Sequence, residues 1–147
     1  MRLGKAPRST TNALSPNSGA RAERIAIPGE LLGTWSATRW QYVSRDEPSR
    51  SLDVVCDARG AVTLSLSAGT YVVTHDIAGD GTQTQGGTCE MIDGRLQLTA
   101  DGADRADVVR YRVSGETLSL KCDESAWDFN GDGREEAAAF VAVLVRL

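Results

Sequence analysis

The chain has 147 residues, the length of a single domain that can bury its own core. Its 16 basic and 20 acidic residues give a net charge of −4, which argues against a nucleic-acid-binding groove. No segment contains the roughly 18 consecutive apolar residues of a membrane-spanning helix, so no transmembrane segment is expected.

Residues 1–29 differ in composition from the rest of the chain. Up to Pro28 they hold five bases and one acid, among many Ser, Thr, Asn and Ala residues. They lack the apolar stretch of roughly 7 to 15 residues that a secretory signal requires. We expect a flexible segment, or a lid over a barrel, before a domain spanning residues 30–147. The chain is expected in the cytoplasm as written, and in the periplasm or outside the cell if the start is misassigned or a leader was removed.

From Leu31 onward, apolar and polar residues alternate between glycine-containing turns, which predicts β-strands. Gly86-Gly87 predicts a bulge or bend within one of them. The expected strands are Leu31–Val43, Ser51–Asp57, Ala61–Ser67, Thr70–Ile77, Gln83–Met91, Arg95–Thr99, Asp107–Val113, Glu116–Cys122 and Ala137–Leu147.

Short connectors join these strands and carry the residues of tight hairpins, such as Asp93-Gly94 and Ser114-Gly115. No segment of useful length shows helical periodicity, so the chain is expected to be all-β, an antiparallel meander. Closing such a sheet removes its exposed edges. The sequence therefore predicts an up-and-down barrel of about eight or nine strands, whose interior is filled by side chains or holds one small ligand.

A structural pair is expected where the barrel closes. Gly33-Thr34-Trp35 opens the first barrel strand and Arg146 lies near the end of the last one, so Arg146 should cover the ring of Trp35. This arrangement resembles the signature of the lipocalins. Leu31–Trp35, Gly69-Thr70-Tyr71, the run from Trp127 to Glu136 and Leu144-Val145-Arg146 together resemble a bacterial lipocalin-like, calycin-type group. The resemblance implies a small barrel that can hold an apolar ligand, and it supplies no catalytic residues.

Aromatic and polar side chains on the strands are candidates for lining a ligand cavity, although aromatics on strands also form plain core. An apolar small molecule bound inside the barrel is the first functional hypothesis. A barrel enzyme, such as a cyclase or isomerase using His75 and Tyr71, is an alternative. The candidate ligand-binding residues are Trp40, Tyr42, Tyr71, His75, Tyr111 and Phe140.

The acidic run before the last strand has two interpretations. Asp128, Asn130, Asp132 and Gly133 match the first positions of a calcium-binding loop. Ala139 stands where that loop needs a bidentate carboxylate, and Asp, Asn and Gly also build tight turns. A turn is therefore the main prediction and a calcium site the minor one, and no other cofactor is expected.

Three cysteines, Cys56, Cys89 and Cys122, are an odd number, which leaves at least one unpaired. We expect three small buried thiols, although two could pair in an oxidising compartment. A Cys56–Cys89 bridge would suit a third hypothesis, a secreted interaction or inhibitor protein. The last strand is apolar on both faces, so one face could pack on the N-terminal segment or on a second copy in a homodimer.

Overall fold

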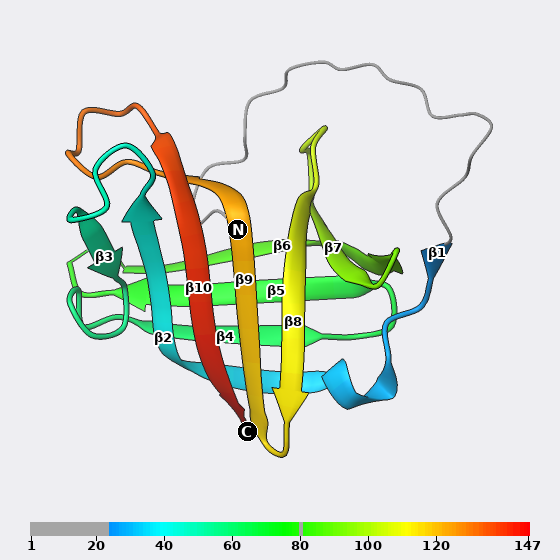
Figure 1. Cartoon of the computed structure of the whole chain (residues 1–147). Helices are drawn as coiled ribbons and strands as arrows, with labels where there is room; N and C mark the ends of the chain where they lie inside the picture. The colour runs from blue at the N-terminus through cyan, green and yellow to red at the C-terminus, as the bar shows by residue number, and fades with distance from the viewer. Residues whose placement is uncertain (1–23, 80) are drawn as a thin grey trace.

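Eight antiparallel strands close into one barrel in the computed structural model, which describes residues 24–79 and 81–147 (Figure 1). Each strand neighbours the next along the chain, and β10 returns to pair with β2. The predicted all-β up-and-down barrel is thereby confirmed. Its strands are β2 (Gly33–Ser44), β4 (Ala61–Leu66), β5 (Thr70–Ile77), β6 (Gly81–Ile92), β7 (Arg95–Ala100), β8 (Asp107–Ser114), β9 (Thr117–Trp127) and β10 (Glu136–Arg146).

Three short elements accompany the barrel: β1 (Arg24–Ile25), the 3-10 turn η1 (Gly29–Leu31) and β3 (Ser51–Asp53). β1 pairs with the end of β6, and Ile27 is buried in the core. The last residues of the predicted flexible segment 1–29 therefore contact the barrel, and the domain begins before residue 30. Residues 1–23 of the predicted flexible segment lie outside the described residues.

β2 bends because it contains an extra residue. Its register with β10 shifts between Val143 and Leu144, which leaves Thr38 as a bulge, and the Thr38 hydroxyl donates to the carbonyl of Val143. The first part of β2 pairs with β4 and the last part with β3. A bulge of this kind increases local twist. In Figure 1, β8, β9 and β10 accordingly cross steeply over β4, β5 and β6.

The inward face of every barrel strand contributes to one hydrophobic core. Alternation explains this, because successive residues of a strand point to opposite faces. On β4, for example, Val62, Leu64 and Leu66 are buried while the residues between them are not. The largest fully buried side chains are Trp35, Trp40, Tyr42, Phe140, Leu31, Leu64, Leu96, Leu98, Leu118, Leu120, Leu144 and Val54.

The predicted strand from Ser51 to Asp57 is wrong in its second half. β3 ends at Asp53, whose carboxylate accepts the backbone N–H groups of Val55 and Cys56. Side chains that bind nearby backbone in this way compete with strand pairing. Cys56 is consequently exposed, whereas Cys89 and Cys122 are buried, and all three are free thiols. The expectation of three buried thiols therefore fails at Cys56.

Gly86-Gly87 forms no bulge, because β6 keeps an unbroken register with both β5 and β7. Glycine is needed at position 87 because Thr99 and the Tyr71 ring approach its backbone closely. A Cβ at position 87 would lie 2.1 Å from the carbonyl oxygen of Thr99 and 2.7 Å from the ring of Tyr71. The hairpin chemistry at Asp93-Gly94 is as expected, with positive φ at both residues.

One end of the barrel is closed by the pair predicted from the sequence. The guanidinium carbon of Arg146 lies 4.2 Å from the centre of the Trp35 ring. Its two terminal nitrogens donate to the carbonyls of Leu32 and Glu30, at 2.8 Å each, and the Trp35 indole donates to the carbonyl of Leu31. Arg146 therefore connects the last strand to the segment that leads into β2.

No helix in the described part of the chain is both long and apolar enough to cross a membrane.

Candidate functional site

The candidate site is a cleft where β8 and β9 separate. These strands pair from Ser114 and Thr117 as far as Arg110 and Lys121. Beyond that point β8 continues to pair only with β7, ending with Asp107 opposite Leu98. The hydrogen-bonded pairing of β8 with β9 therefore ends before the strands do, and an opening remains between them.

A bulge in β9 explains why the two strands part. Cys122 lies opposite Phe140 of β10, but Ser125 lies opposite Ala138, so Asp123 and Glu124 together face a single residue. The extra residue bends β9. Bulges of this kind are frequent beside binding and active sites, where they redirect side chains.

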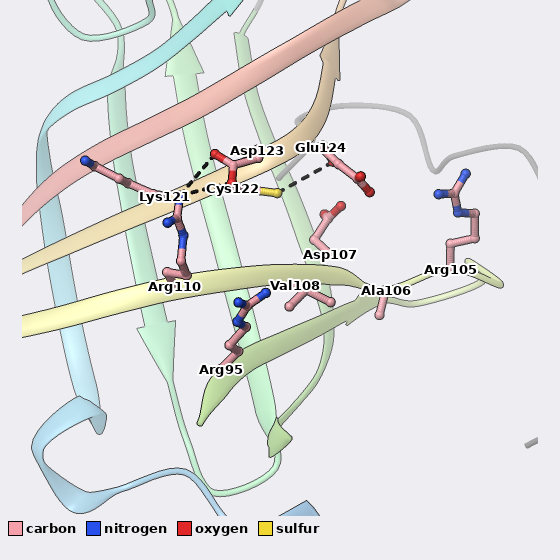
Figure 2. A pocket seen from close by; sticks show the side chains of 10 residues that line it. All are labelled: Arg95, Arg105, Ala106, Asp107, Val108, Arg110, Lys121, Cys122, Asp123 and Glu124. Atoms are coloured by element: carbon pink, nitrogen blue, oxygen red, sulfur yellow. Dashed lines mark hydrogen bonds and ion pairs between the residues drawn. The ribbon is translucent and has the colours of Figure 1, made fainter. Parts of the chain in front are cut away.

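The cleft has a volume of about 330 Å³, near the lower limit for small-molecule sites. Of its lining residues only Cys122 is buried, so Cys122 marks the inner end. Figure 2 shows the Cys122 sulfur directed toward Glu124, and it lies 3.6 Å from the Glu124 carbonyl oxygen. The lining residues are Arg95, Arg105, Ala106, Asp107, Val108, Arg110, Lys121, Cys122, Asp123 and Glu124.

Asp107 connects the cleft electrostatically to the barrel interior. It shares the inward face of β8 with the buried Val109. Burial is the main reason why the pKa values of Tyr42 and Tyr71 are raised, and the negative charge of Asp107 raises both further. One carboxylate at the cleft thus acts on two phenols of the core.

Three of the aromatic residues predicted to line a ligand cavity pack together in the core. Trp40 meets Phe140 edge-on at 4.8 Å between ring centres, and Tyr42 lies 5.2 Å from Phe140. The Tyr42 ring also stacks on the Trp127 ring, with 4.5 Å between their centres. The Trp40 indole N–H donates a hydrogen bond to the Tyr42 hydroxyl. The rings are close enough to gain aromatic packing energy from each other. These side chains form core, and Trp127 completes a cluster that the sequence did not predict.

The other three candidates are placed separately. Tyr71 and His75 lie on the inward face of β5 with Val73 between them, and both are buried. Tyr111 is partly buried and packs against the core from β8. None of the six predicted ligand-binding residues lines the cleft.

The acidic loop between β9 and β10 is folded by its own side chains. The Asp128 carboxylate accepts the backbone N–H groups of Gly131, Asp132 and Gly133, and Asp132 accepts that of Arg134. Desolvation acts to raise the pKa of Asp128, but the backbone donors together outweigh it and lower the pKa. The loop has the contacts of the predicted turn. Among the described residues, no group of three or more His, Cys, Asp and Glu side chains could hold a metal ion.

No known family, curated protein or solved structure matches the chain.

The sequence held a partial signal for the cleft. Arg95, Arg110 and Lys121 each occupy a polar position of an alternating strand, which places them on the outer face. Nothing in their spacing along the chain shows that three separate strands bring them together. The bulge at Asp123 and Glu124 also contains no glycine or proline that would have indicated it in the sequence.

Proposed function

We propose that this protein binds a small amphipathic molecule in the cleft between β8 and β9. A barrel of this kind is compatible with small-ligand binding. The observation that carries the proposal is the cleft itself, an opening of about 330 Å³ that reaches from the surface to the buried Cys122. In this arrangement the apolar part of the ligand contacts Ala106 and Val108, and its polar part faces the charged rim.

The proposed ligand lies in the cleft and not at the centre of the barrel. Trp40, Tyr42 and Phe140 are at most 1% exposed, and the Phe140 ring contacts the rings of both Trp40 and Tyr42. An apolar molecule bound among them would have to displace packed rings, which costs the contacts that those rings make. The cleft needs no such displacement.

We further propose that the chain is a lipocalin-like protein. An eight-stranded up-and-down barrel and the Arg146 side chain over the Trp35 ring support this kinship. Tyr71 and His75, on which an enzymatic alternative depended, lie outside the cleft, so no catalytic role is proposed for them.

Chemical-shift mapping with 1-octanol tests the proposed site. We expect backbone amide shifts to concentrate in residues 106–110 and 121–124, with an affinity on the order of millimolar for so small a probe. Ala106→Trp should fill the cleft and weaken the shifts at the remaining cleft amides. Val72→Trp is the matched control, because Val72 is exposed on the outer face of β5.

Two outcomes would count against the cleft. Shifts concentrated around Trp40 and Phe140, and unaffected by Ala106→Trp, would place the ligand in the barrel interior. Shifts scattered without a centre, equal in both tryptophan variants, would show that the protein has no site for this probe.

A further inference from the structure

Three cations form a row across the outer face of β7, β8 and β9. Arg110 and Lys121 are direct cross-strand partners. The register of β7 with β8, which pairs Leu96 with Val109, brings Arg95 level with Arg110 when continued by one residue. Figure 2 shows Arg95 and Arg110 extending from neighbouring strands beside the cleft. Adjacent strands lie only about 4.8 Å apart, so these charges are close neighbours.

Such a row is unfavourable for the isolated protein. Like charges directly opposite each other on neighbouring strands destabilise a sheet. Asp123 relieves the row only in part, through an ion pair of 3.0 Å with Arg110 in which both side chains are more than half exposed. Exposed pairs of this kind contribute little.

The other cations of the cleft have no anionic partner within the part of the chain that the structure describes. Within residues 24–79 and 81–147, no hydrogen bond or ion pair engages the side chains of Arg95, Arg105 or Lys121. The cleft holds fewer carboxylates than cations, because Asp123 is paired with Arg110 and only Asp107 and Glu124 are present with Arg95, Arg105 and Lys121. Glu124 is the one acidic side chain left among the exposed lining residues.

We propose that the ligand carries an anionic head group of the carboxylate or phosphate type, held by Arg95 and Lys121 beside Arg110, with Arg105 adding positive charge from the other end of the cleft. This inference rests on the proposed function, since it identifies the polar part of the molecule in the β8/β9 cleft. Guanidinium groups suit both anions because their planar forks donate two parallel hydrogen bonds, while Lys121 adds a point charge. Ala106 and Val108 would contact the apolar part.

A series of probes with one chain and different head groups tests the inference. Octanoate, octyl phosphate, 1-octanol and octylammonium are titrated separately against the labelled protein, and the amide shifts of residues 106–110 and 121–124 report binding. We expect one or both anions to bind at least about tenfold more tightly than 1-octanol. The tighter of the two anions identifies the head group. The anion preference should also weaken as salt concentration rises.

Charge-matched variants separate a local site from the overall charge. Arg95→Gln, Arg105→Gln and Lys121→Gln are combined in one protein. The control combines Arg45→Gln, Arg59→Gln and Arg134→Gln, which removes as many positive charges from exposed positions away from the cleft lining. The cleft variant should bind octanoate and 1-octanol within about twofold of each other, while the control keeps the anion preference. If the triple cleft variant does not fold, single Arg95→Gln and Lys121→Gln variants should each reduce the preference several-fold.

The outcomes distinguish this inference from the proposed function. Equal binding of all four probes at the cleft would overturn the anionic head group and leave the proposed function standing. An anion preference lost equally in both triple variants would also overturn it, because general charge would then explain the preference. Binding of none of the four probes would overturn the proposed function and this inference with it.

Discussion

Arg146→Ala should open the closed end of the barrel. The substitution removes the contact of 4.2 Å with the Trp35 ring and both hydrogen bonds of 2.8 Å to the carbonyls of Leu32 and Glu30. It also removes a contact of 3.5 Å with Glu116. The ring contact and the two hydrogen bonds connect β10 to β2 and to the segment before it, so their loss acts on the strand pair that closes the barrel.

The size of the effect follows from the exposure of each partner. The contact with the ring contributes about 1 kcal/mol. Each hydrogen bond from a charged donor contributes about 1 kcal/mol, below the usual value for charged groups because the Arg146 side chain is 27% exposed. Glu116 is 77% exposed, so its contribution is below about 0.5 kcal/mol. Arg146→Ala should therefore lower the free energy of unfolding by about 3 kcal/mol, equivalent to roughly 6–12 °C in Tm.

Urea unfolding followed by tryptophan fluorescence and far-ultraviolet circular dichroism measures this loss. Arg146→Lys should be intermediate, because it keeps the charge but loses the fork that reaches two carbonyls. Glu116→Gln is the control and should stay within about 0.5 kcal/mol of the unmutated protein. If Arg146→Ala were no more destabilising than Glu116→Gln, the assigned role of Arg146 in closing the barrel would be refuted.

Three further predictions concern the loop, the glycine pair and the buried phenols. Asp128→Ala should lower Tm equally with and without calcium, because the carboxylate binds backbone N–H groups; a Tm of the unmutated protein that rises only with calcium would contradict this. Since the pKa of Asp128 is lowered in the folded protein, its contribution to the free energy of unfolding should be fully present above about pH 4 and be lost as pH falls below that value. Acid unfolding of the unmutated protein and of Asp128→Ala measures this difference. Gly87→Ala should destabilise by more than about 2 kcal/mol or prevent folding, whereas Gly86→Ala, whose Cβ would meet nothing closer than 3.4 Å, should cost at most about 1 kcal/mol; equal urea midpoints would contradict the close approach. Burial raises the pKa of Tyr42 and Tyr71, so the stability gained from keeping these phenols neutral should be fully present below about pH 10 and be lost above it. An absorbance titration should show the two phenols ionising together with unfolding; ionisation before unfolding would contradict this.

Much of the fold could be predicted because its signals are local. Alternation along β4 is visible in three apolar residues at every second position, and the Asp93-Gly94 turn follows from tolerance of positive φ. Prediction failed where one side chain competes with pairing, as Asp53 does at the end of β3. The predicted bulge at Gly86-Gly87 is also absent, and close packing against Thr99 is what requires glycine at position 87.

The candidate site divides in the same way. The tight hairpin around Gly115 fixes the register that sets Arg110 opposite Lys121, so this half of the cation row follows from the sequence. Arg95 belongs to the row because of the register between β7 and β8. The connection between these strands is longer than a tight hairpin, so no local rule determines that register.

The sequence by itself determined that the chain alternates and turns, because both depend on residues that are near neighbours, and the edges that an open sheet would expose predicted its closure. Only the tertiary structure decided whether the aromatic side chains line a cavity or fill it. That outcome depends on the space enclosed by eight strands, and Trp40 and Tyr42 from β2 meet Phe140 from β10 within it. The same long-range pairing decided where an opening is left, because the bulge in β9 parts it from β8 at the charged cleft.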